Sequence, residues 1–121
     1  HIDETTGKVN AFIDYLKERP AEETAVVMGD FNFVPSNSDS NSKYHEMFID
    51  IGLDVSWRDL RIDVTARNTS RVFKPEKERI GRVIYHIMYD PNKIKAVDGD
   101  IIELEKPLSD HKPVWAQLEL K

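Results

Sequence analysis

The sequence has no cysteine, which excludes a disulfide framework and a thiolate zinc site. No apolar run approaches the roughly 18–20 residues that a membrane-spanning helix needs, because the longest such run is residues 25–28. Basic side chains are outnumbered, since 17 Lys and Arg stand against 22 Asp and Glu and the net charge is −5. That balance argues against coating nucleic acid without regard to sequence, but it leaves room for an enzyme whose carboxylates hold a metal. The cellular compartment stays undetermined.

The remaining composition is that of one globular unit. Of the 121 residues, 40% are hydrophobic and 32% are charged, which excludes a disordered or fibrous chain and permits one core. No repeat, low-complexity tract or linker divides the sequence. Residues 1–121 are therefore expected to form a single unit.

Hydrophobic spacing predicts an alternation of helix and strand. Apolar residues at i, i+3, i+4 and i+7 from Val9 to Leu16 predict a helix that ends before Pro20. The short apolar run of residues 24–29 predicts a strand buried on both faces, and residues 30–42 are expected to form a loop. Further predicted elements are a helix over 43–51 that ends at Gly52 and strands over 82–89, 94–97, 101–104 and 113–120. The expected fold class is α/β with one mixed sheet.

The strongest candidate for a functional site directly follows the first predicted strand. In Gly29-Asp30-Phe31-Asn32, a carboxylate and a carboxamide lie at positions i and i+2 and leave the strand end on the same side. Ligands of α/β sheets bind at the carboxyl ends of strands. Asp30 offers hard oxygen to Mg²⁺ or Mn²⁺, and Asn32 offers an N–H donor to a phosphate oxygen. The alternative is an Asx-rich turn that binds no ligand.

A second candidate, Ser109-Asp110-His111, precedes the alternating C-terminal strand. Asp110 could supply a metal carboxylate, and His111 an imidazole that accepts a proton near neutral pH. For this short motif alone, a surface loop is the alternative.

Together, the two motifs resemble those of the endonuclease/exonuclease/phosphatase superfamily, which has the deoxyribonuclease-I-like fold and includes sphingomyelinases and inositol-polyphosphate 5-phosphatases. Residues 47–58 look like the family's helix and following "GL-D-WR" stretch, and residues 82–89 lie where its "R-I-D-Y-I" strand belongs. His1 falls where the family has the histidine of a strand-terminal "T-H-L". The resemblance covers the whole chain.

The resemblance implies half of a larger domain. The family domain has two similar α/β halves whose sheets pack face to face, and this chain is similar to the second half. The implied fold is one half of a four-layer α/β/β/α sandwich, a mixed sheet with helices on one face. The other face would be apolar and would associate with the N-terminal half of the same domain or with a second copy of the chain.

The activity that the resemblance implies is hydrolysis of a phosphoester with Mg²⁺ or Mn²⁺. Asp110 and Asp30 would serve the metal, with Asp30 also positioning the attacking water. His111 would accept a proton from that water, and Asn32 and His1 would bind the phosphate. The substrate could be a nucleic acid, a lipid headgroup or a sugar phosphate. Because the first half of the family domain supplies an Asn and a Glu that hold the metal, the isolated chain is expected to be inactive.

Departures from the family pattern leave alternatives open. The family's strand Asp, which fixes the tautomer of the Asp-His histidine, is absent, and Tyr85 or Ile84 stands there. A catalytically degenerate binding or structural derivative is therefore the alternative function, and an unrelated metal- or nucleotide-binding domain is the third. His1 is either a terminal remnant or the phosphate contact. His45 is expected on the surface, and His86 is expected to be structural.

Overall fold

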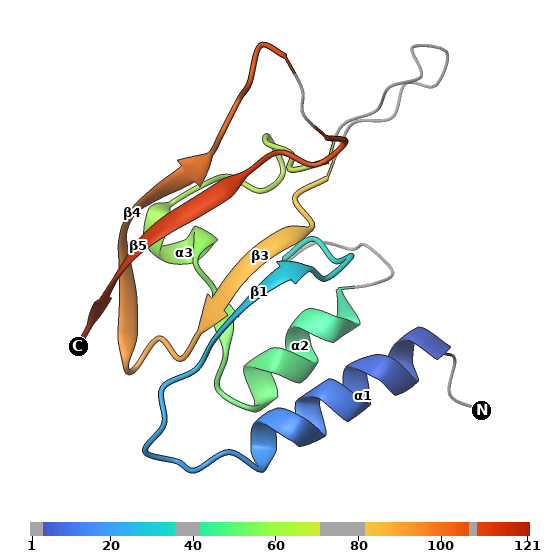
Figure 1. Cartoon of the computed structure of the whole chain (residues 1–121), viewed down its shortest axis with the longest axis vertical. Helices are drawn as coiled ribbons and strands as arrows, with labels where there is room; N and C mark the ends of the chain where they lie inside the picture. Colours follow the sequence, from blue (N-terminus) through green and yellow to red (C-terminus); the bar gives the residue numbers. More distant parts are fainter. Residues whose placement is uncertain (1–3, 36–41, 71–81, 107–108) are drawn as a thin grey trace.

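The computed structural model describes residues 4–35, 42–70, 82–106 and 109–121 (Figure 1). These residues form the helices α1 (Glu4–Lys17), α2 (Lys43–Asp50) and α3 (Trp57–Leu60). They also form the strands β1 (Val26–Asp30), β2 (Asp54–Val55), β3 (Tyr85–Tyr89), β4 (Ile94–Ile101) and β5 (Val114–Leu120). The predicted α/β class is confirmed. Over the described ranges, no helix is both long and apolar enough to cross a membrane.

The strands form two small antiparallel sheets, with the orders β1-β3-β2 and β4-β5. The prediction of one mixed sheet is wrong for the described residues. Strand β3 is antiparallel to both β1 and β2 and lies between them, so the two strands that run in the same direction do not pair. The strand predicted over 94–97 is longer than expected: it continues as β4 through a register shift between Ala96 and Asp98 and ends at Ile101. The prediction of a separate strand over 101–104 is wrong, because residues 102–104 belong to no strand.

Helix α1 packs mainly on α2. Phe12 meets Phe48 edge to face, with ring centroids 6.2 Å apart, and the hydroxyls of Thr6 and Tyr44 lie 3.2 Å apart. Helix α2 ends as predicted, because Gly52 follows it with φ of +87°, a conformation that glycine adopts without strain.

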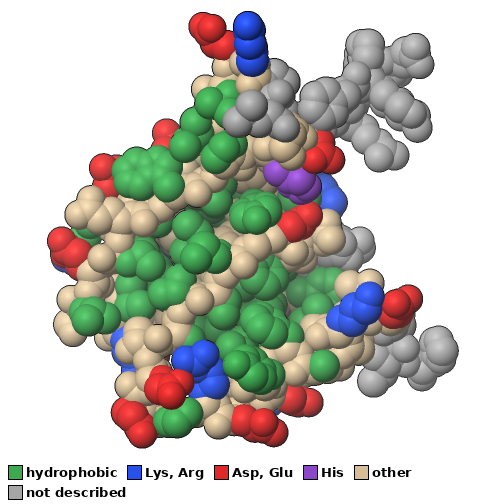
Figure 2. Space-filling model, viewed as in Figure 1, with side chains coloured by type: hydrophobic (Ala, Val, Ile, Leu, Met, Phe, Trp, Pro, Cys, Tyr) green, Lys and Arg blue, Asp and Glu red, His purple; other side chains and the backbone are tan. Residues whose placement is uncertain are grey.

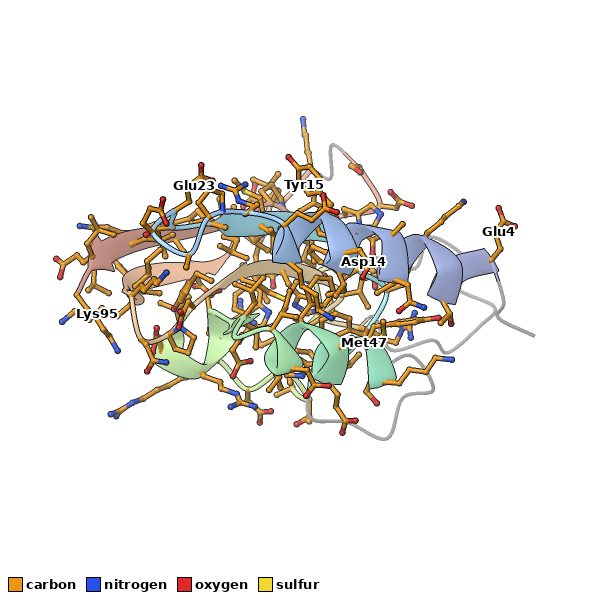
Figure 3. All side chains as sticks on the ribbon, turned by 90° about the horizontal axis from the view of Figure 1, so that it is seen from below. Glu4, Asp14, Tyr15, Glu23, Met47 and Lys95 are labelled. Carbon is orange, nitrogen blue, oxygen red and sulfur yellow. The ribbon has the colours of Figure 1, made fainter. Side chains whose placement is uncertain are left out.

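The helices α2 and α3 lie on one side of the strands, and α1 flanks them (Figures 1 and 3). The opposite side carries apolar side chains over β1 and β3 (Figure 2). Burial alternates along β1, where Val26 is 39% and Met28 is 69% exposed. The prediction that this strand is buried on both faces is therefore wrong, because no described element covers that side of it.

The main core lies between the β1-β3-β2 sheet and the helices α1, α2 and α3. Its buried members are Ile13, Phe33, Tyr44, Phe48, Leu53, Val55, Trp57, Val83, Met88 and Ile101. Phe33 belongs to the loop that leaves β1 and is completely buried. Because fully burying such a side chain contributes about 1.5–3 kcal/mol, the core fixes this loop against α2. The loop in turn carries the first candidate site.

Candidate functional site

The end of β1 forms a tight turn in which the two carboxylate oxygens of Asp30 make different contacts. Its Oδ1 accepts a hydrogen bond from the Asn32 N–H at 3.0 Å, and Asn32 has a left-handed φ of +56°. Asn tolerates that conformation better than most residues. The Asx turn named as the alternative is thus present, but it uses only one carboxylate oxygen, and Oδ2 is left to face His111.

The Asp-His motif is anchored through its backbone. His111 forms an antiparallel bridge with Ser70, and the N–H of Lys112 donates to the Thr69 carbonyl at 2.6 Å. Within the motif, the Ser109 hydroxyl accepts a hydrogen bond from the His111 N–H at 3.1 Å. These contacts hold the imidazole beside the end of β1 before β5 begins.

The two motifs meet at His111. Its Nε2 lies 3.8 Å from Asp30 Oδ2 and 3.8 Å from Asp110 Oδ1. The side chains of His111 and Asp30 are 35% and 32% exposed, so a ligand could reach them from solvent. The two sequence motifs therefore do lie together, while the chemical role of each side chain stays a prediction. His1 lies outside the described residues.

The other nitrogen of His111, Nδ1, faces no acceptor in the part of the chain that the structure describes. Nδ1 is buried and has no hydrogen-bond partner among the described residues. Tyr85, the first residue of β3, is the neighbour of His111, and the centroids of the two rings lie 5.9 Å apart. Tyr85 also pairs with Asp30 in the ladder between β3 and β1. Of the two residues that could replace the family's Asp, Tyr85 is thus the one beside His111, whereas Ile84 is buried. Because a buried N–H without an acceptor costs about 1–3 kcal/mol, the contacts of the described residues favour the neutral tautomer with its proton on Nε2.

The described residues do not complete a site for Mg²⁺ or Mn²⁺. No three acidic or histidine side chains among them are grouped closely enough to hold a metal ion. One oxygen of Asp30 already accepts the Asn32 N–H, and Oδ1 of Asp110 accepts from the Ser109 hydroxyl at 3.2 Å. Because such ions take about six oxygen ligands, Asp30 and Asp110 could supply only part of a coordination shell.

His45 is buried, so its predicted surface location is wrong. It is only 3% exposed, and its Nε2 donates to Asp54 Oδ1 at 2.8 Å. The other carboxylate oxygen of Asp54, Oδ2, pairs with Nη1 of Arg58 at 2.8 Å. The ring stacks on Phe33 with centroids 5.3 Å apart. Asp54 thus accepts the hydrogen bond that water would accept at the surface, and Phe33 covers the ring.

His86 is structural, as predicted, and is completely buried. Its Nδ1 accepts from the Trp57 indole N–H at 2.9 Å, and its Nε2 lies 2.6 Å from the Phe33 carbonyl oxygen. Burial lowers the pKa of His86 to about 4, the carbonyl of Phe33 opposing and His45 adding to that shift. The imidazole is therefore neutral at physiological pH.

The sequence did not reveal Thr69, which links the start of β3 to Lys112, the residue after the Asp-His motif. Its hydroxyl accepts the N–H groups of Ile84 and Tyr85 at 3.0 and 3.1 Å, and its carbonyl accepts that of Lys112. Thr69 is completely buried. It falls in the polar stretch 53–78, where no periodicity marks it.

A cavity of about 320 Å³ lies away from this site. It is lined by the end of α1, the segment before β1 and the turn after β3, including Leu16, Ala25 and Asp90. Because Val26 pairs with Tyr89 and Asp30 with Tyr85, the cavity and His111 are at opposite ends of β1.

Comparison with known proteins gives matches of structure only. No family model matches the chain, and neither does any curated protein. The 3′ phosphatase NExo from Neisseria, solved with a product DNA hairpin, matches with a TM-score of 0.65 and 21% identity over 95% of this chain and 51% of that one.

Two proteins from Bacteroides thetaiotaomicron match similarly. A mannosyl-6-phosphatase matches with a TM-score of 0.63 and 22% identity over 98% of this chain and 48% of that chain. An endonuclease/exonuclease/phosphatase family protein matches with a TM-score of 0.61 and 22% identity over 98% and 46%. The chain therefore has the fold of one half of an endonuclease/exonuclease/phosphatase protein and spans about half the length of the solved structures that it matches.

Proposed function

We propose that this chain is the C-terminal half of a metal-dependent phosphoesterase domain. The observation that carries the proposal is the placement of Asp30 and Asp110 around Nε2 of His111, 3.8 Å from each carboxylate, at one end of the sheet. The half-domain fold supports it, as do the names of two structural relatives, which are phosphatases. Hydrolysis of a phosphomonoester or a phosphodiester is consistent with this cluster.

In the proposed reaction, water forms a bond to phosphorus while the bond from phosphorus to the alcohol oxygen breaks, and the leaving alkoxide takes a proton from solvent to become the alcohol. Asp30 orients the water and His111 takes its proton at Nε2. The Asn32 amide donates to a phosphate oxygen, Asp110 supports the imidazole or a metal, and His1 supplies a second phosphate contact. Proton acceptance at Nε2 requires the ring proton to be on Nδ1, which then needs an acceptor from outside the described residues.

The first, N-terminal half of the domain would complete both the metal site and the fold. The described residues lack a full ligand set, so further ligands would come from the missing half. The apolar side of β1, where Met28 is 69% exposed, would pack on the sheet of that half and form the four-layer α/β/β/α sandwich. A second copy of this chain is the alternative partner.

The substrate class stays open between a nucleic acid, a lipid headgroup and a sugar phosphate. One structural relative was solved with a DNA product and another is a mannosyl-6-phosphatase, so the fold accommodates both kinds. The net charge of −5 favours a small phosphoester over long DNA.

The test uses this chain together with the sequence encoded before His1. p-Nitrophenyl phosphate and bis(p-nitrophenyl) phosphate are supplied with Mg²⁺ or Mn²⁺, and turnover is expected with one of them. Asp30→Asn and His111→Ala should lower kcat by about 10²–10⁴-fold, the contribution of a general base. Asp14→Asn, an exposed carboxylate on α1, is the matched control and should change nothing. Equal rates for all three variants would refute the proposed site.

A second candidate is a binding derivative without catalysis, and it is supported by the Nδ1 of His111, which has no partner among the residues that the structure describes. In that case the imidazole donates from Nε2 to a bound phosphate and never takes a proton from water. Tyr85→Asp would place a carboxylate on the strand position beside the ring. A gain of about 10-fold or more in turnover would show that tautomer control limits the natural site. Phosphate binding without turnover in either form would favour the binding derivative.

A further inference from the structure

The loop that leaves β1 is held by hydrogen bonds whose direction is fixed. The Trp57 indole can only donate, so its N–H, 2.9 Å from His86 Nδ1, requires a lone pair on that nitrogen. The single proton of the neutral ring is then on Nε2, which donates to the Phe33 carbonyl at 2.6 Å. The chain of bonds runs from α3 through β3 into the loop.

Ring stacking restrains the same loop residue. The Phe33 ring stacks with His86, with centroids 4.5 Å apart and planes 23° apart, and with His45, at 5.3 Å and 11°. Phe33 and His86 are each completely buried. His45 is held in turn by Asp54, so the Phe33 ring packs against two imidazoles that are themselves hydrogen-bonded.

The residue before Phe33 is the one that needs this support. Asn32 has φ of +56°, a left-handed conformation that is unfavourable for any residue with a side chain. Its N–H bond to Asp30 is exposed to solvent, so this bond is a weak restraint. Stronger restraints lie on the residues either side of Asn32: the Phe31 N–H donates to the Ile84 carbonyl at 3.0 Å, and the Phe33 carbonyl accepts the buried bond from His86.

We propose that His86 is a positioning residue, which holds the Phe33 carbonyl so that the turn of Asp30 and Asn32 keeps the shape that faces His111. Its contribution to phosphate binding rests on the proposed function. Its effect on the loop does not, because it follows from contacts within the chain alone.

The first measurement is the backbone order of Asn32, Phe33 and Val34 by ¹⁵N relaxation. Order parameters near 0.85 are expected in the unsubstituted chain and below about 0.6 in His86→Leu, which can neither accept from Trp57 nor donate to the loop. His86→Gln keeps an acceptor and a donor and should restore the order.

The control is Ile94→Val, which trims a buried side chain in the separate cluster around Tyr89. It lowers stability without touching the loop, so its order parameters at Asn32, Phe33 and Val34 should stay unchanged. Should His86→Leu not fold, His86→Asn gives the same contrast with His86→Gln, because the shorter amide cannot reach both partners. Unchanged order in His86→Leu or His86→Asn would overturn the proposal, and so would a failure of His86→Gln to restore it.

The second measurement is a titration with inorganic phosphate, followed at the Asn32 side-chain amide. Binding in the unsubstituted chain and in His86→Gln, weakened about 10-fold or more in His86→Leu, would show that the held turn binds phosphate. An absence of phosphate binding in every variant would count against the proposed function, and the order parameters would still decide the role of His86.

Discussion

Protonation of His86 should make the stability of the fold depend on pH. An imidazole in the unfolded chain titrates near 6.5, whereas burial lowers the pKa of His86 in the folded chain to about 4. Between these values the unfolded state binds a proton that the folded state does not. The contribution of His86 is therefore fully present above pH 6.5 and is lost as the pH falls toward 4. At 1.36 kcal/mol for each pKa unit, the loss amounts to about 3 kcal/mol.

The assay is urea unfolding followed by circular dichroism at several pH values between about 7.5 and 4, a range that spans the titration of an imidazole. The free energy of unfolding is compared between the unsubstituted chain and His86→Gln. Carboxylates and the other histidines titrate in both proteins, so the difference between the two curves isolates His86. The advantage of the unsubstituted chain should shrink by about 3 kcal/mol across this range. Parallel curves would show that His86 is not held neutral and would refute the reasoning.

Three further predictions concern activity, association and packing. With Mg²⁺ or Mn²⁺, the 121-residue chain alone should hydrolyse bis(p-nitrophenyl) phosphate no faster than background; turnover that His111→Ala abolishes would contradict this. Sedimentation equilibrium at micromolar concentration should show self-association through the apolar side of β1, and Met28→Lys should shift the equilibrium toward monomer. A monomeric unsubstituted chain that melts cooperatively would contradict this prediction. Gly99→Ala should lower the free energy of unfolding by about 1–3 kcal/mol, measured in urea, because a Cβ there would overlap the Trp115 carbonyl oxygen and lie 2.9 Å from the Ala116 Cα. An unchanged midpoint would mean that β4 and β5 adjust freely.

The elements that the sequence predicted are those in which periodicity extends over several residues. The helix around Val9 and Leu16 is α1, and the alternation of residues 113–120 is β5. Strand β2 has two residues and α3 has four, too few for a period to be visible. Sheet pairing was beyond reach for another reason, since the place of β3 between β1 and β2 depends on contacts far apart in the sequence.

The candidate site was predictable only where several polar residues of catalytic or metal-binding type occur next to one another in the sequence. Asp30 and His111 were found because each lies in a short motif of polar residues at a strand end, and the structure does bring them together. His45 was placed on the surface because its neighbours in the sequence gave no sign of Asp54 and Phe33. Thr69 carries no local signal, because its importance comes from hydrogen bonds to residues far away in the sequence, among them those that it accepts from the N–H groups of Ile84, Tyr85 and Lys112.

Strand β1 is the terminal strand of its sheet among the described residues, paired with β3 along one edge. The backbone N–H and C=O groups of its other edge are directional and are not satisfied by apolar contact. A partner that only covered Met28 would leave them unpaired, whereas an added strand would satisfy them and fix its own register at the same time. Because α1 precedes β1, a strand before α1 that paired with β1 in parallel would complete a β-α-β unit. This edge would therefore select a partner by backbone geometry as well as by apolar surface, and an extended segment of another protein would meet the same unpaired backbone groups.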